Sequence, residues 1–107
     1  MKNLINDQLD HLQNVLFALS DSIGQNPELG LTEYQSAAKL TGLLADHGFA
    51  VDMNLCGYET AFRAVYDSGK AGPTIAFLAE YDALPEIGHG CGHNMIGVMA
   101  AGAGIGL

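Results

Sequence analysis

Six side chains able to bind a metal ion or transfer protons are concentrated within fourteen residues of this sequence: Glu80, Asp82, Glu86, His89, Cys91 and His93. The last three alternate with glycines, so in an extended loop their side chains point the same way and the backbone can fold around an ion. A thiolate and imidazoles are ligands that zinc prefers, and nearby carboxylates can complete or orient such a set. The pattern therefore predicts a divalent-metal site.

Each of these residues also has a simpler interpretation. His89 could be a loop histidine bonded to a carbonyl group, and Cys91 could be a small buried hydrophobic residue. Three donors stand at alternating positions beside two carboxylates. This arrangement favours a metal site, because otherwise the simpler interpretations of all these residues would have to hold at once. Cys56 has no such neighbours, and the adjacent Gly57 suggests a turn, so we interpret Cys56 as structural.

Two amphipathic helices are predicted upstream of the cluster. In the first, over 5–23, apolar residues recur at steps of three and four along one stripe. The second is expected to open at Thr32, with Gln35 three residues later as its capping-box partner, and to end near His47.

Three strands are predicted next, over 49–55, 62–66 and 74–79. The third has almost no polar residues, which is typical of a strand covered on both faces in the middle of an α/β sheet. A loop over 84–88 and an apolar helix from Met95 follow. This order, helix-helix-strand-strand-strand-loop-helix, indicates an α/β fold. The polar cluster follows the buried strand, at the sheet edge where α/β proteins usually bind ligands.

The composition bounds both the domain count and the class of partner. At 107 residues the chain forms at most one domain, and its 49% hydrophobic content excludes intrinsic disorder. Twelve acidic residues against four basic ones give a formal charge of −8, which disfavours nucleic acid and membrane surfaces as partners. The start of the sequence lacks signal-peptide features, and the longest apolar run is shorter than the ~20 residues needed to cross a bilayer. We therefore predict a soluble protein of the reducing cytoplasm.

Two stretches of the sequence resemble a known enzyme family. One is PTIAFLAEYDALPEIGHGCGHN at 73–94, and the other is NPELGLTEYQSAAKLTGLLADHGFAVD at 26–52. Both are similar to the metal-dependent amidohydrolase and exopeptidase family that includes aminoacylases, hippurate hydrolases and aminobenzoyl-glutamate hydrolases. The C-G-H-N run, with Asn94 where many relatives carry aspartate, is most like the aminobenzoyl-glutamate hydrolase and dipeptidase branch. The resemblance implies that residues 1–107 form the front part of a zinc-exopeptidase-like three-layer α/β/α catalytic domain.

The resemblance also implies roles for residues of the cluster. Cys91 would be a thiolate that bridges two divalent metal ions, and His93 would bind one of them. Asp82 would be a catalytic-site residue that supports the metal ligands, whereas the roles of Glu80 and His89 stay open. The metal would be zinc, with manganese, cobalt or nickel as alternatives. The reaction would be hydrolysis of the amide bond of an N-acyl amino acid or a dipeptide.

One feature of that family is missing from these residues. The family's general base belongs to a Glu-Glu pair, and this sequence contains no such pair. We therefore expect a truncated, partial catalytic domain that lacks the later ligands and the lid and dimerisation domain, and that is inactive alone. Two alternatives stay open: a divalent-metal-binding module without catalysis, and an inert remnant. In either case, uncovered apolar surface predicts self-association.

Overall fold

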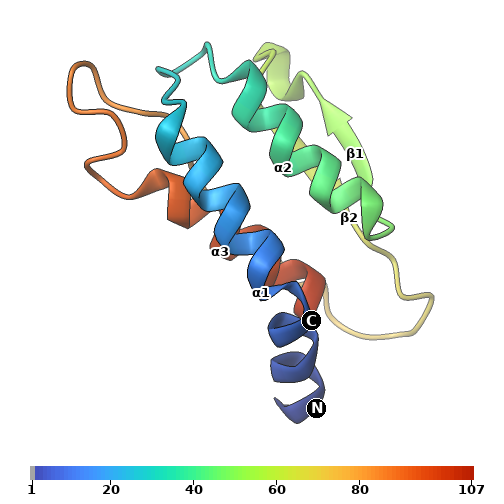
Figure 1. The fold of residues 1–107 in the computed structure, drawn as a ribbon. Coiled ribbons are helices and arrows are strands. Elements are labelled where there is room, and N and C mark those ends of the chain that lie inside the picture. The colour runs from blue at the N-terminus through green and yellow to red at the C-terminus, as the bar shows by residue number, and fades with distance from the viewer. Residues whose placement is uncertain (1) are drawn as a thin grey trace.

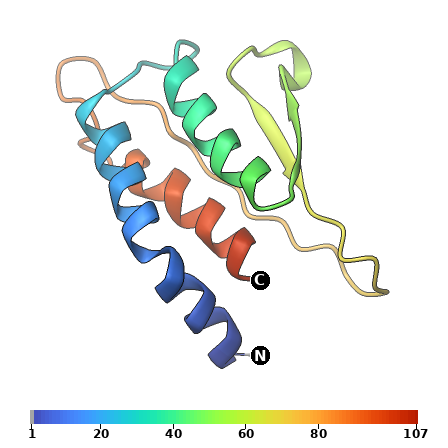
Figure 2. The same ribbon diagram turned by 45° about the vertical axis from the view of Figure 1, so that its right-hand side comes forward.

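The computed structural model describes residues 2–107. Its elements in chain order are α1 (Lys2–Gln25), α2 (Tyr34–Asp46), β1 (Ala50–Met53), the 3-10 helix η1 (Leu55–Gly57), β2 (Phe62–Val65) and α3 (His93–Gly106) (Figure 1). Figure 2 shows α3 between α1 and α2, with the β1–β2 hairpin beside α2. Helices and strands are both present, as the α/β prediction requires. Within residues 2–107, no helix is long and apolar enough to span a bilayer.

Helix α1 buries the apolar stripe that the sequence predicted. Leu12 and Ile23 are buried, and Leu16 packs against the core. Gly102 of α3 faces this stripe, because a Cβ atom added there would lie only 3.1 Å from Cδ1 of Leu16. The missing side chain at Gly102 therefore lets α1 and α3 approach closely.

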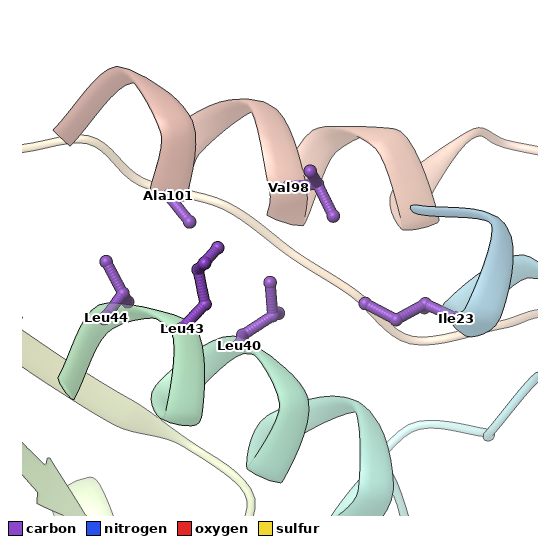
Figure 3. Close-up of a cluster of buried hydrophobic side chains, with 6 residues drawn as sticks. All are labelled: Ile23, Leu40, Leu43, Leu44, Val98 and Ala101. Atoms are coloured by element: carbon purple, nitrogen blue, oxygen red, sulfur yellow. The ribbon is translucent and has the colours of Figure 1, made fainter. Parts of the chain in front are cut away.

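The core consists of six buried residues from three helices: Ile23, Leu40, Leu43, Leu44, Val98 and Ala101. In Figure 3 the leucines of α2 point toward Val98 and Ala101 of α3, and Ile23 extends from the end of α1 toward the same cluster. Burial of each leucine contributes roughly 1.5–3 kcal/mol to folding, so this three-helix contact is the main source of stability.

The first turn of α2 is capped differently from the prediction. Thr32 does not form a capping box, because its hydroxyl donates to the carbonyl oxygen of Leu29 at 2.8 Å. The carboxylate of Glu28 accepts hydrogen bonds from the backbone N–H groups of Gln35, at 3.0 Å, and Ser36, at 2.6 Å. It also accepts one from the Ser36 hydroxyl at 2.7 Å. The capping-box prediction is wrong, since a carboxylate from the preceding turn satisfies these N–H donors.

The first two predicted strands form, each shorter than expected. β1 and β2 pair antiparallel, with Ala50 opposite Val65 and Met53 opposite Phe62. The hairpin packs against α2, and Phe62 and Ala64 of β2, with Phe49 just before β1, contribute to the edge of the core.

The expected third strand, over 74–79, is not formed among the described residues. This segment has no hydrogen-bonded neighbour, and its side chains are exposed, with Leu78 at 88%. A buried strand needs a paired strand and a covering layer on each face, and the β1–β2 hairpin provides neither at this position. The segment instead runs along α3, where the Phe77 ring lies close to Gly104. The three-layer arrangement stays a prediction.

Candidate metal centre

His93 is the first residue of α3, and its imidazole lies between two carboxylates. Nδ1 is 2.9 Å from Oδ1 of Asp82 and 3.0 Å from the Asp82 carbonyl oxygen, and Nε2 is 3.2 Å from Oε2 of Glu80. Gly92, which precedes the helix, has a φ of 79°, a conformation that glycine adopts without strain. This turn allows the first residue of α3 to face the segment that carries both carboxylates.

Glu80 and Asp82 lie two residues apart in an extended segment, so their side chains project to the same side. Tyr81 projects to the opposite side, where its hydroxyl donates to the carbonyl oxygen of Thr60. Its ring centroid lies 5.9 Å from that of Phe62. Burial, with a smaller contribution from nearby carboxylates, raises the pKa of Tyr81 to about 12. Tyr81 therefore anchors the segment by packing and hydrogen bonding, and the two carboxylates stay free to face His93.

The partners of His93 determine which of its nitrogens is available. Nδ1 faces two oxygens of Asp82, so we assign its hydrogen to this nitrogen, which donates to Asp82. In a neutral ring, Nε2 then presents a lone pair to the Glu80 carboxylate. That contact is favourable only when a proton or a cation lies between the two groups. A histidine bound to a metal ion usually donates its other N–H to a carboxylate or carbonyl, which is the position that Asp82 occupies.

The donor set fits a divalent metal ion. One ligand atom from each of Glu80, Asp82 and His93 lies within 4.8 Å of the other two. Two ligand atoms bound to one zinc ion at about 2.0–2.2 Å lie roughly 3–3.5 Å apart. The Nε2–Oε2 distance of 3.2 Å between His93 and Glu80 agrees with this spacing. The side chain of Glu80 is 73% exposed, so an ion can reach the site from solvent.

The structure brings only part of the predicted site together. His93 and Asp82 are in contact, but Cys91 is an exposed free thiol in the loop before α3. It lies outside the three-residue group found within residues 2–107. Its role as a ligand stays a prediction.

His89 lies in the same loop with both ring nitrogens buried and without hydrogen-bond partners. The bond to a carbonyl group that its simpler interpretation required is therefore not formed. Burial lowers the pKa of His89, the neighbouring His93 lowers it further, and Asp82 acts in the opposite direction.

The sequence left the role of Glu80 open. The structure places its carboxylate against Nε2 of His93. The available signal was its spacing of two residues from Asp82, which places both carboxylates on one side of an extended chain. The position of His93 opposite them depends on how α3 packs, and spacing along the chain does not specify that packing.

A pocket of about 270 Å³ opens beside these residues. Glu80 and Asp82 form part of its wall, and Glu33, Tyr58 and Phe62 form other parts. No lysine or arginine is among the described residues that line it. The space next to the candidate metal centre is therefore acidic, with partly apolar walls.

Comparison with curated proteins identifies hydrolases. The chain is 37% identical over 116 residues to Xaa-Arg dipeptidase of Mus musculus, a match that covers 100% of the chain and 27% of the relative. It is 36% identical over 110 residues to Xaa-Arg dipeptidase of Homo sapiens, with 92% of the chain and 25% of the relative covered. It is 38% identical over 104 residues to one of the p-aminobenzoyl-glutamate hydrolase polypeptides of Escherichia coli, with 81% of the chain and 21% of the relative covered.

The chain spans about a quarter of the length of these relatives. No family model matches it. The named relatives are dipeptidases and an aminobenzoyl-glutamate hydrolase, which are the kinds of enzyme that the C-G-H-N run indicated. The resemblance is thereby confirmed: over 81–100% of its length, the chain is similar to these dipeptidases and to this hydrolase.

Proposed function

We propose that Glu80, Asp82 and His93 belong to the divalent-metal site of an enzyme that hydrolyses the amide bond of a dipeptide or an N-acyl amino acid. The observation that carries this proposal is the His93 ring between two carboxylates, with Nδ1 on Asp82 and Nε2 facing Glu80. The names of the relatives support the reaction class, because they describe a dipeptidase and an amide hydrolase. Residues 1–107 would then be part of a three-layer α/β/α catalytic domain.

The three side chains have distinct roles in this proposal. Nε2 of His93 and the carboxylate of Glu80 would hold the ion. Asp82 keeps the hydrogen on Nδ1 and fixes the orientation of the ring. A bound divalent ion lowers the pKa of a water molecule and polarises the scissile carbonyl group. Zinc is the ion we propose, because imidazole, carboxylate and thiolate groups all occur among its usual ligands.

Cys91 is proposed as a further ligand. Its exposure leaves the sulfur atom free to reach an ion, and thiolates bind zinc and similar metals strongly. Cobalt(II) provides a direct test, because a cobalt–thiolate bond absorbs intensely in the near ultraviolet and imidazole or carboxylate ligands do not. Cys91→Ser should abolish this absorption, and Cys56→Ser, which changes the other free thiol, should leave it unchanged. Equal spectra for the wild type and Cys91→Ser would remove Cys91 from the ligand set.

The charge of the neighbouring pocket favours one kind of substrate. A bound divalent ion would offset the charges of Glu80 and Asp82, which leaves Glu33 as a further negative charge in the lining, with no basic residue among the described ones. A positively charged side chain would therefore be attracted to the Glu33 side of the pocket and a carboxylate repelled. We therefore propose a dipeptide with a basic residue, as in the name of the two mammalian relatives, in preference to an aminobenzoyl-glutamate-like substrate.

Zinc titration followed by calorimetry tests the metal site. The wild-type chain should bind zinc, and His93→Ala should weaken binding by about a hundredfold or more, which corresponds to ~2.7 kcal/mol. His11→Ala is the matched control, since His11 is exposed on α1 and lies outside the three-residue group. Equal zinc affinity in the wild type and His93→Ala would contradict the proposed site.

Hydrolysis requires a general base as well as a metal ion. Because the 107 residues contain no Glu-Glu pair, we propose that this chain alone binds zinc without measurable turnover of dipeptides or N-acyl amino acids. Zinc-dependent hydrolysis that disappears in Cys91→Ser would contradict this expectation. We also propose a reducing, cytoplasmic setting, in which Cys56 and Cys91 stay unpaired thiols.

A further inference from the structure

Glu28, in the turn before α2, contacts two distant parts of the chain. Its side chain accepts the hydrogen bonds from Gln35 and Ser36 that cap α2. Its backbone carbonyl oxygen accepts a hydrogen bond from the N–H of Ala83 at 2.7 Å. The next residue, Leu29, forms a parallel bridge with Ala83. A single residue therefore links the start of α2 to the segment that carries the candidate metal centre.

The hydrogen bond between Ala83 and Glu28 attaches the backbone of the segment that carries Glu80 and Asp82. Ala83 directly follows Asp82 and is 3% exposed. From residue 72 to Asp82, no backbone group makes a backbone–backbone hydrogen bond within residues 2–107. Gly30, in the same turn as Glu28, also lies against the site, because a Cβ atom there would be 3.8 Å from Oδ2 of Asp82. The turn thus sets the position of the chain at the point where Asp82 meets His93.

We propose that Glu28 is a positioning residue for the metal centre. Its carboxylate fixes the turn to α2, its carbonyl group fixes Ala83 to the turn, and Asp82 is thereby placed to hold Nδ1 of His93. The inference rests on the proposed function, because it assumes that His93 binds an ion when Asp82 holds its other nitrogen. Glu28 itself does not touch the ion, since its side-chain oxygens are occupied by the first turn of α2.

Glu28→Gln tests this role with little change in side-chain shape. The amide nitrogen of the new side chain would face a backbone N–H that now has an acceptor, so the turn should loosen. Glu59→Gln is the matched control: Glu59 accepts a hydrogen bond from Tyr34, the first residue of α2, at 3.1 Å, and the change removes the same charge. Supporting groups of this kind typically change metal affinity about 10–100-fold. We expect zinc affinity to fall about tenfold in Glu28→Gln and to stay unchanged in Glu59→Gln.

A measurement without metal separates this inference from the proposed function. The ratio of the Ala83 exchange rate to that of a core amide such as Leu44 should rise about tenfold in Glu28→Gln, because loosening at Ala83 adds to any loss of global stability that both amides share. A uniform increase at both amides would indicate general destabilisation and would overturn the positioning role. The wild-type chain could bind no zinc while Ala83 exchange is still selectively faster in Glu28→Gln. That result would refute the proposed function and would still support the attachment of Ala83 through Glu28.

Folding of the variants is monitored by circular dichroism at the temperature of the titration. If Glu28→Gln loses helical signal, Ser36→Ala replaces it, because this change removes one of the three hydrogen bonds to the carboxylate and retains the two backbone ones. It should lower zinc affinity about twofold to fivefold. The inference would be overturned if the folded Glu28→Gln or Ser36→Ala variant had the zinc affinity and the Ala83 exchange rate of the wild type. An equal loss of zinc affinity in Glu59→Gln would also overturn it.

Discussion

The helical core and the extended segment over 72–82 are both rich in apolar residues, but their environments are opposite. Leu40 in α2 is 1% exposed and packs against α3, whereas Leu78 in the segment is 88% exposed. Helical hydrogen bonds satisfy the backbone around Leu40, and the backbone of the segment has no such partners within residues 2–107. The apolar character of a stretch thus does not decide its burial, because burial also needs neighbouring elements.

The same comparison separates stability from chemistry. The core has no group able to bind a metal ion, while the weakly attached segment carries Glu80 and Asp82. Tyr81 and Ala83 connect the segment to the rest of the structure through the Thr60 and Glu28 carbonyl oxygens. We infer that changes in the core alter the free energy of unfolding, and that changes at these attachments alter metal binding first.

The largest expected difference lies between two leucine substitutions. Leu40→Ala should lower the free energy of unfolding by about 2–5 kcal/mol, since it removes buried methyl groups and leaves a cavity. Leu78→Ala makes the same chemical change at an exposed site and should stay within about 0.5 kcal/mol of the wild type. Urea unfolding followed by circular dichroism measures both. A cost at Leu78 similar to that at Leu40 would mean that the segment is buried in solution.

A substitution at the metal centre should lower metal affinity and leave the free energy of unfolding almost unchanged. Asp82→Asn should reduce zinc affinity about 10–100-fold, because a neutral amide supports the His93 ring less strongly than a carboxylate. The free energy of unfolding without metal should change little, since the side chain of Asp82 is partly exposed. Asp52→Asn, on the hairpin, removes the same charge from an exposed ion pair with Arg63 and serves as the control. Calorimetric titration that gives equal affinities for both variants would disprove this role of Asp82.

The exposed segment also predicts self-association. Between residues 74 and 79, its unpaired backbone groups and apolar side chains, together with Met99 on α3, form an uncharged surface on which a second chain can pair. Leu78→Lys should raise the concentration of half-association about tenfold, since it removes a leucine whose burial is worth roughly 1.5–3 kcal/mol. Light scattering over a range of concentrations measures this change. A wild-type chain that stays monomeric throughout would contradict the prediction.

Periodicity predicted those parts of the fold that depend on local sequence. The stripe over 5–23 marked α1, and alternation marked both strands of the hairpin, because each signal reflects packing on one face. The run over 74–79 predicted burial on two faces. That burial requires a paired strand and covering layers, which residues 2–107 do not provide at this position. The cap of α2 was missed for a similar reason, since the acceptor from Glu28 lies outside the expected Thr32–Gln35 pattern.

The candidate site was predictable in its residue types and in part of its geometry. The sequence indicated His93 and Asp82, and the structure places them 2.9 Å apart. The contact with Glu80 depends on the path of an irregular segment along α3, and no local pattern encodes that path. Cys91 matched the family motif, but its distance from the carboxylates depends on the conformation of a glycine-rich loop.

The smallest expected effect concerns Glu28 and pH. Burial alone would raise the pKa of Glu28, but hydrogen bonds from Ser36 and Gln35 and the charge of Lys39 outweigh it, so the pKa is below its usual value of 4.5. A carboxyl group with a lower pKa in the folded state stabilises the fold above its unfolded-state pKa. This stabilisation is lost as the pH falls through the lower, folded-state value.

Glu28→Gln should therefore cost about 1 kcal/mol of unfolding free energy at pH 7, the typical value of a helix cap. The difference from the wild type should shrink as the pH is lowered below 4.5, because the wild-type carboxyl group then also loses its charge. Glu59→Gln, at an exposed position, should stay within about 0.5 kcal/mol of the wild type throughout. Urea unfolding at a series of pH values measures all three proteins. A Glu28→Gln difference that is constant with pH would show that the cap does not depend on the ionised carboxylate, and the link from α2 to Ala83 would then need another anchor.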